Sequence, residues 1–107
     1  MADQGADGWA VAPAATGGFV WKDFSRFVEV APVRTGWLVL WGRYEAQGAR
    51  KVLLGNRTYT TLAGARRRFA DAALELTRDP RLVADGLTLF DRHPFPHREP
   101  IRLPEPL

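Results

Sequence analysis

Apolar and polar residues alternate most clearly over residues 23–33, in the segment DFSRFVEVAPV. Val28 and Val30 fall on one side of the alternation and Phe27 on the other, a pattern typical of a half-buried strand. Because proline has no amide hydrogen to donate to a sheet, we expect this strand to end at Pro32.

The next segment, GWLVLWGRYE at 36–45, is apolar at both sets of alternating positions. A strand with two apolar faces is typical of the centre of a sheet. One face would carry Trp37, Val39 and Trp41, and the other Leu38, Leu40 and Tyr44. We therefore predict a central strand here, after a turn at Thr35 and Gly36.

Two shorter segments, RKVLL at 50–54 and RTYTT at 57–61, flank the dipeptide Gly55-Asn56. Glycine at the first position of a two-residue loop is typical of a tight β-hairpin. Together these patterns predict four consecutive strands that form an antiparallel meander.

A helix is expected after the fourth strand, with Thr60 or Thr61 as its N-cap. The apolar residues that follow recur at helical spacing and form one stripe. The stripe consists of Leu62, Ala65, Phe69, Ala72, Ala73 and Leu76. We expect the helix to end near Asp79-Pro80, and the segment RLVADGLTLF behind it to form a helical turn and then an extended piece over 86–90.

The two ends of the chain differ in composition from the middle. Residues 1–18 are rich in alanine and glycine and predict a flexible arm, with Trp9 and Val11 as its only anchors. Residues 91–107 contain five prolines, which favours an extended tail over a helix or a central strand. The apolar side chains available for docking this tail are Phe95, Ile101, Leu103 and Leu107. The sequence thus predicts a small α+β domain over 19–90, with a four-stranded antiparallel meander and one amphipathic helix packed on one face of the sheet.

The composition excludes several classes of protein. With 107 residues, the chain is long enough for one small domain. It has no cysteine, which rules out disulfides, thiolate nucleophiles and cysteine-ligated metal sites. Its start lacks the features of a signal peptide, and its apolar run at 36–42 is far shorter than the roughly 20 residues that span a bilayer. We therefore expect a cytoplasmic protein without a membrane partner.

Charge is distributed unevenly along the chain, although the net charge is only +3. Residues 22–69 hold ten basic and three acidic side chains, whereas both ends carry an excess of acidic ones. Such segregation indicates an anionic partner. Two other interpretations stay open: the acidic ends fold back on the basic middle, or the preference for arginine over lysine reflects a GC-rich genome.

Three consecutive arginines, Arg66, Arg67 and Arg68, lie in the predicted helix but do not share one of its faces. Arg67 is spaced to meet Asp71 one turn on, and Arg68 to reach Glu75 two turns on, as on a solvated surface. Arg66 is left beside the amides of the first turn, which makes it a candidate phosphate-binding residue.

Residues that could support catalysis are scarce. Ser25 is the only serine and lacks the Gly-x-Ser-x-Gly context of a nucleophile elbow. His93 and His97 fall in the proline-rich tail with no third metal ligand near in sequence, so we interpret both as solvent-exposed. We therefore expect no catalytic residues, no metal site and no cofactor, and a protein that is not an enzyme.

The two-faced central strand bears most directly on function. A single helix covers one face of a sheet, and we expect it to lie on the Leu38 and Leu40 face. The Trp37 and Trp41 face would then stay uncovered, and an uncovered apolar patch marks an interaction site. Tryptophans beside arginines on a sheet are typical of a platform for single-stranded nucleic acid. The candidate binding residues are Trp37, Trp41, Arg43, Arg50, Lys51, Arg57 and Arg66.

Other occupants of this face stay open, namely a second copy in a homodimer, a larger protein, or the chain's own tail. The leading hypothesis is a non-catalytic module that binds single-stranded nucleic acid through a basic, tryptophan-bearing sheet face. The alternative is an accessory or structural subunit that docks onto a larger protein, or onto itself, through the tryptophan face and the proline-rich tail.

Overall fold

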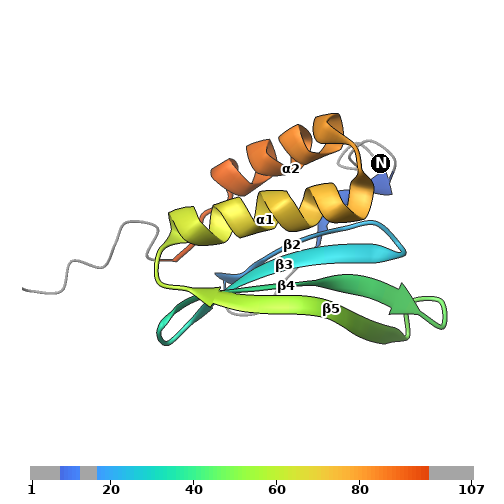
Figure 1. Ribbon diagram of the computed structural model, residues 1–107, viewed down its shortest axis with the longest axis horizontal. Coiled ribbons are helices and arrows are strands. Elements are labelled where there is room, and N and C mark those ends of the chain that lie inside the picture. Colours follow the sequence, from blue (N-terminus) through green and yellow to red (C-terminus); the bar gives the residue numbers. More distant parts are fainter. Residues whose placement is uncertain (1–7, 13–16, 97–107) are drawn as a thin grey trace, which may run out of the picture.

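Five strands form one antiparallel sheet, and two helices lie side by side on one of its faces (Figure 1). The computed structural model describes residues 8–12 and 17–96. The strands are β1 (Ala10–Ala12), β2 (Phe19–Lys22), β3 (Arg26–Val33), β4 (Gly36–Glu45) and β5 (Arg50–Tyr59), and the helices are α1 (Leu62–Thr77) and α2 (Pro80–Arg92). Because the strands follow one another in chain order, the predicted α+β class and antiparallel meander are confirmed, while the numbers of strands and helices differ.

The sheet begins earlier in the chain than the sequence pattern indicates. β1 pairs with β2, and β2 with β3, in a region that includes part of the predicted arm. Trp9, Phe19 and Trp21 are buried, and the rings of Trp9 and Trp21 stack with 4.2 Å between their centroids. The folded part therefore extends back to Trp9. Residues 1–7 and 13–16 of the predicted arm lie outside the described residues.

β5 is one continuous strand, so the hairpin predicted at Gly55 is wrong. Gly42 pairs with Leu53 and Trp41 pairs with Gly55, which leaves Leu54 as the extra residue of a β-bulge. A side chain on Gly55 would overlap the Trp41 indole, which packs directly against the glycine. Glycine therefore serves here to admit the tryptophan ring rather than to form a turn.

α1 starts and packs as its apolar stripe predicts. Thr61 is the N-cap, and its side chain accepts a hydrogen bond from the Gly64 amide at 3.0 Å. The helix ends where Arg78 adopts a left-handed conformation, with a φ of 56°. The stripe faces the core through the buried Ala65, Phe69, Ala72 and Ala73 and the partly buried Leu62 and Leu76.

A second helix, α2, occupies the segment for which the sequence predicts a helical turn and an extended piece. Asp79 is its N-cap and accepts a hydrogen bond from the Arg81 amide, and Pro80 takes the first helical position, where no amide hydrogen is needed. Gly86 is a contact point rather than a break, since an added Cβ would lie only 3.0 Å from the Trp21 indole. The predicted extended piece is therefore wrong.

The helices cover the tryptophan face of the sheet, which is the face opposite to the one expected. Trp37 and Val39 are buried beneath the helices, whereas Leu38 and Leu40 on the uncovered face are half-buried. The reason is that β2 and the residue before β1 add large aromatic rings to the tryptophan side, and the small alanines of α1 fit closely against them. The core consists of Trp9, Phe19, Trp21, Val28, Val30, Trp37, Val39, Ala65, Phe69, Ala72, Ala73, Leu82, Val83, Phe90 and Phe95.

The uncovered face is shielded by side chains of the sheet itself. Phe27 lies on this face and is fully buried, with the Lys51 ammonium 4.8 Å and the Tyr44 ring 5.1 Å from its ring centroid. Lys51 also pairs with Glu29 at 3.3 Å, and the Lys22 ammonium lies over the Tyr44 ring. The Lys51 side chain and the Tyr44 ring thus take the place of a helix as cover for this phenylalanine.

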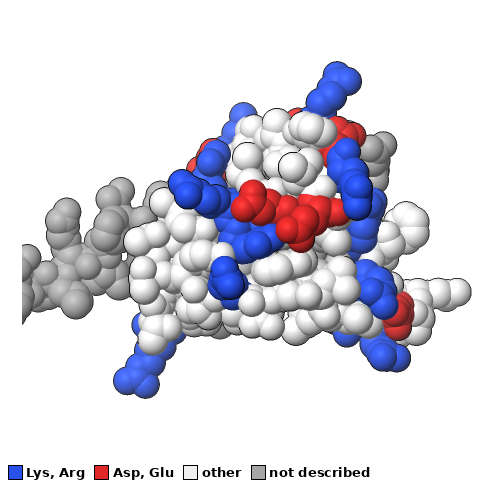
Figure 2. All heavy atoms as spheres, in the orientation of Figure 1, with Lys and Arg blue, Asp and Glu red and all other residues white. Residues whose placement is uncertain are grey.

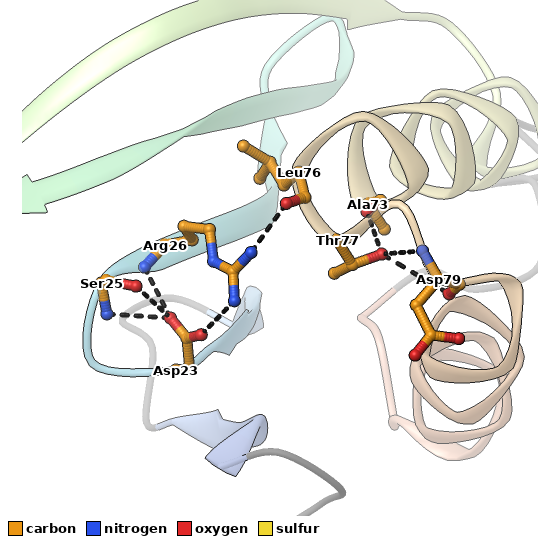
Figure 3. Close-up of polar contacts among 7 residues, drawn as sticks. All are labelled: Asp23, Ser25, Arg26, Ala73, Leu76, Thr77 and Asp79. Atoms are coloured by element: carbon orange, nitrogen blue, oxygen red, sulfur yellow. Dashed lines mark hydrogen bonds and ion pairs between the residues drawn. The ribbon is translucent and has the colours of Figure 1, made fainter.

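The turn between β2 and β3 is held by one carboxylate and tied to α1 by one guanidinium (Figure 3). One oxygen of Asp23 accepts hydrogen bonds from the amides of Ser25 and Arg26, at 2.8 and 2.7 Å, and the other accepts from the Arg26 side chain. The same guanidinium donates to the carbonyl oxygen of Leu76 near the end of α1. Burial raises the pKa of Asp23, but these hydrogen bonds outweigh it and hold the pKa below its ordinary value.

The described part of the proline-rich tail packs against the core. Phe95 is buried, with its ring centroid 5.3 Å from that of Trp37 and 4.8 Å from that of Phe90. His93 is the C-cap of α2 and its ring contacts Phe19 and Phe95, so the interpretation of His93 as a solvent-exposed tail residue is wrong. Outside the described residues lie 97–107, and with them His97 and the docking candidates Ile101, Leu103 and Leu107.

Candidate functional site

The two tryptophans predicted as a stacking platform lie on the helix-covered face. Trp37 is only 7% exposed. Trp41 is partly buried, packed over Gly55 and against the Arg68 guanidinium, whose carbon lies 4.4 Å from its ring centroid. In this arrangement the two rings do not form an open platform, so a binding surface of the described residues has to lie elsewhere.

Most of the predicted basic residues are engaged in ion pairs. Arg43 and Arg50 both approach Glu45, at 2.9 and 3.8 Å. Lys51 pairs with a glutamate of β3, as described above. Arg57 is the member of the predicted set that forms no ion pair with another described residue. Its charge is therefore available to a ligand.

The three consecutive arginines of α1 have three different surroundings. Arg66 donates two hydrogen bonds of 2.7 Å to the two carboxylate oxygens of Asp91, and these hydrogen bonds raise its pKa above the ordinary value. This pair joins α1 to α2 and holds Arg66 away from its predicted place as a phosphate ligand. Arg68 pairs with Glu75 at 2.9 Å, as predicted, whereas Arg67 forms no ion pair with a described residue.

A groove of about 470 Å³ lies where β5 ends and α1 begins. Arg57 and Tyr59 lie on the helix side of β5, since they pair with core residues of β4. Arg67 and Arg68 approach the same space from α1. The groove is lined by Arg57, Tyr59, Thr61, Ala63, Gly64, Arg67, Arg68 and Asp71.

Positive charge predominates in this groove, because three arginines line it against a single carboxylate, that of Asp71. The first turn of α1 has no acidic residue, and the amides of Leu62 and Ala63 precede the first intrahelical hydrogen bond, which Ala65 donates to Thr61. The helix dipole therefore adds partial positive charge at the same end. Such a groove suits an anionic group.

Beside the groove, β5 forms an edge of the sheet with no strand beyond it in the part of the chain that the structure describes. Seven of its ten residues are exposed, among them Leu53 and Leu54 at 50% and 52%. About half of the backbone amides and carbonyls of an edge strand point away from the sheet and are free to pair with another strand. The opposite edge, β1, has only three residues. β5 is therefore the long open edge of this sheet.

Figure 2 shows the side of the molecule on which β5 lies nearest the viewer. Basic and acidic side chains gather over α1 and between the helices and the sheet, whereas the surface over much of β5 is uncharged. The edge strand thus offers a largely uncharged strip that is bordered by charged side chains.

Of the residues that line the groove, Arg57 alone belongs to the binding set predicted from sequence, and Tyr59, Arg67 and Arg68 are among those that were missed. The alternation Arg57-x-Tyr59 carries a signal for the first, because alternate residues of a strand share one face. An N-cap at Thr61, directly after that strand, brings the first turns of the helix beside the same face. The sequence does not show which face of the sheet the helix covers. Without that information, the residues of the strand and those of the first helical turns could not be assigned to one groove.

Among residues 8–12 and 17–96, no group of three or more histidine, cysteine, aspartate or glutamate side chains is arranged to hold a metal ion. Neither helix of that part of the chain has the length and hydrophobicity needed to cross a bilayer. Comparisons with protein-family models, with curated proteins and with solved structures give no match. The groove and the edge strand are thus the features of the described residues that bear on function.

Proposed function

We propose that this chain is a non-catalytic binding module that docks onto an extended segment of a larger protein by adding that segment to the edge of its sheet. The observation that supports it is the exposed edge of β5, which is ten residues long and has no neighbouring strand among the described residues. At about 3.3 Å per residue, this edge is about 33 Å long, and the bulge at Leu54 divides it into two regular stretches.

Strand addition is a common way for one protein to recognise an extended piece of another. The backbone hydrogen bonds supply affinity, and the pockets beside the edge select alternate side chains. β5 provides both parts, since the arginine-lined groove lies on one side of the edge and the exposed Leu53 on the other.

A different protein fits this edge better than a second copy does. β5 carries Arg50, Lys51 and Arg57 and no acidic residue. Two copies paired along β5 would bring these cations together along one seam, where like charges repel. The bulge at Leu54 interrupts regular pairing with any added strand, so the charges and not the bulge distinguish a different protein from a second copy.

Site-specific photo-crosslinking in the native host tests the proposal. A photoreactive residue replaces Asn56, which is exposed on β5, and in a matched variant it replaces Arg81, which is exposed on α2. We expect the Asn56 variant to form an adduct of one discrete mass that survives nuclease treatment, and the Arg81 variant to form none. Absence of any adduct at Asn56, or equal adducts at both positions, contradicts docking through β5.

Single-stranded nucleic acid is the second candidate, because Arg57 and Arg67 face one groove and lack ion pairs with described residues. Phosphates bound there would displace counterions, so affinity for an oligonucleotide should fall steeply with salt. Fluorescence anisotropy of labelled oligothymidylate measures this directly. Absence of a saturable signal at low salt removes this candidate.

A further inference from the structure

We infer that the segment accepted by β5 is acidic on the side that faces α1, and that one of its carboxylates enters the groove between Arg57 and Arg67. This inference rests on the proposed docking through β5 and specifies the chemistry of the partner. It follows from the register of the sheet, from the charges of the groove and from the side chains on the other face of β5.

The register places the groove beside one row of an added strand. Arg57 and Tyr59 pair with the buried Val39 and Trp37, so both lie on the helix side of β5. In an added antiparallel strand, every second side chain would lie on this same side, about 5 Å from its neighbour on β5. A side chain opposite Arg57 would therefore enter the space that Arg57, Arg67 and Arg68 line.

The charges that line the groove determine which charge the partner's side chain should carry. Arg68 is partly neutralised by Glu75 and packs on Trp41, with its side chain 18% exposed. Arg57 and Arg67 form no ion pair with a described residue, and Asp71 is the single acidic side chain in the lining. A carboxylate would accept charge-assisted hydrogen bonds from guanidinium groups, which are stronger than neutral ones, whereas a cation would meet repulsion.

The other face of β5 calls for a different side chain. Leu53, Asn56 and Thr58 pair with Gly42, Leu40 and Leu38 and thus lie on the uncovered face. Lys51, the next residue of this row, is already paired with Glu29, and the exposed Leu53 beside it favours an apolar or β-branched neighbour on an added strand. The fitting segment therefore alternates acidic residues with apolar ones.

A peptide explains these features together better than a nucleic acid does. Phosphates would satisfy the arginines, but a nucleic acid backbone cannot continue the amide and carbonyl ladder of a sheet. An acidic strand satisfies both the arginines and the open edge, and it buries Leu53 as well.

The test uses the full chain and three fluorescent peptides in anisotropy titrations at low salt. The first alternates glutamate and valine, the second has glutamine in place of glutamate, and the third is the acidic peptide with N-methyl groups on alternate amides. We expect the acidic peptide to bind about tenfold more tightly than the glutamine peptide, as for charge-assisted hydrogen bonds. The N-methylated peptide should not bind, since it cannot form the ladder.

Two protein variants locate the interaction. Arg57→Gln combined with Arg67→Gln should reduce the affinity for the acidic peptide to that for the glutamine peptide. Arg81→Gln is the matched control, because Arg81 lies at the start of α2, beside the end of α1 remote from the groove, and should leave the affinity unchanged. All three arginines are surface residues, and thermal melts check that each variant stays folded.

The outcomes distinguish docking through β5 from the preference for an acidic segment. Equal binding of the acidic and glutamine peptides, with loss on N-methylation, overturns the acidic preference and leaves docking through β5 in place. Failure of both peptides to bind overturns docking itself. Binding of the acidic peptide that N-methylation does not affect, or that persists in the double arginine variant, also contradicts the assignment, as does saturable binding of oligothymidylate in place of the peptides.

Discussion

The two faces of the sheet bury aromatic side chains by different means. On the helix-covered face, Phe69 packs against the rings of Phe19, Trp21 and Phe90. On the uncovered face, Phe27 is equally inaccessible to solvent, and the Lys51 and Tyr44 side chains of the sheet lie against its ring. Complete burial of a side chain therefore does not show whether the groups that cover it are rigid or mobile.

The difference lies in what covers each face. Helices are fixed by their caps and by contacts along their length, so atoms removed beneath them leave a cavity. A lysine side chain retains rotamer freedom at the surface and can close over a gap. Truncation of one phenylalanine on each face tests this contrast.

Phe69→Ala should have the larger effect. We expect a loss of about 3–5 kcal/mol in the free energy of unfolding, because the cavity forms between a fixed helix and the sheet. In a domain of ordinary stability this is a large share of the total. Urea unfolding measures the loss, with Leu74→Ala, a truncation on the exposed side of the same helix, as the control. Equal losses in both variants would show that α1 is not firmly packed.

Phe27→Ala should cost less, about 2–3 kcal/mol, because Lys51 and Tyr44 can move into the space that the ring leaves. The same urea experiment gives the value. A loss as large as that of Phe69→Ala would contradict the view that the uncovered face is loosely held.

Asp23→Asn tests the turn between β2 and β3, which Arg26 ties to α1. We expect a loss of about 1–3 kcal/mol at neutral pH, since a buried group that accepts several hydrogen bonds is altered. The folded-state pKa of Asp23 is depressed, so its ionisation stabilises the fold above the unfolded-state pKa, and this contribution is lost as pH falls through the folded-state pKa.

The variant and the parent protein should therefore converge in stability at low pH. Unfolding curves at neutral pH and at several acidic pH values below the ordinary pKa of aspartate measure this convergence. Asp85→Asn, at an exposed position of α2, should change neither curve. A difference between the parent and Asp23→Asn that stays constant with pH would contradict the role given to the carboxylate.

Lys51→Ala should have the smallest effect, about 1 kcal/mol or less, because its side chain is half exposed. Lys51→Met keeps most of the aliphatic stem and removes the charge. If the stem is what shields Phe27, the methionine variant should melt close to the parent protein and the alanine variant below it. Equal melting temperatures for both variants would assign the effect to charge instead.

The strand order and the first helix could be predicted from sequence, because alternation in β3 and β4 and the stripe of α1 are local patterns. Gly55 and Gly86 were the misleading signals. Each suggests a break in regular structure, yet each lies beneath a tryptophan, Trp41 and Trp21 respectively. Glycine at a contact with an indole looks the same in sequence as glycine at a turn, since only the tertiary partner distinguishes them. The N-cap and proline at the start of α2 were the better signal.

The candidate site was harder to predict than the fold. A strand with two apolar faces does not show which face a helix covers, and that choice depended on rings contributed by Trp9 and by β2. Of the predicted binding residues, Arg57 forms no ion pair with a described residue, whereas Arg66 is paired with Asp91, which lies on a helix that the sequence pattern did not reveal. A contact between residues far apart in the sequence produces no periodic pattern of apolar and polar positions.

The stacked indoles of Trp9 and Trp21 have an optical consequence. Two tryptophan rings with centroids 4.2 Å apart and planes tilted by 32° are close enough to couple electronically, so we expect paired bands of opposite sign in circular dichroism. Trp9 directly precedes β1 and Trp21 belongs to β2, so this couplet requires the first strand to be in place. The loss of these bands in a Trp9→Phe variant would therefore report, without any label, on the attachment of the N-terminal strand.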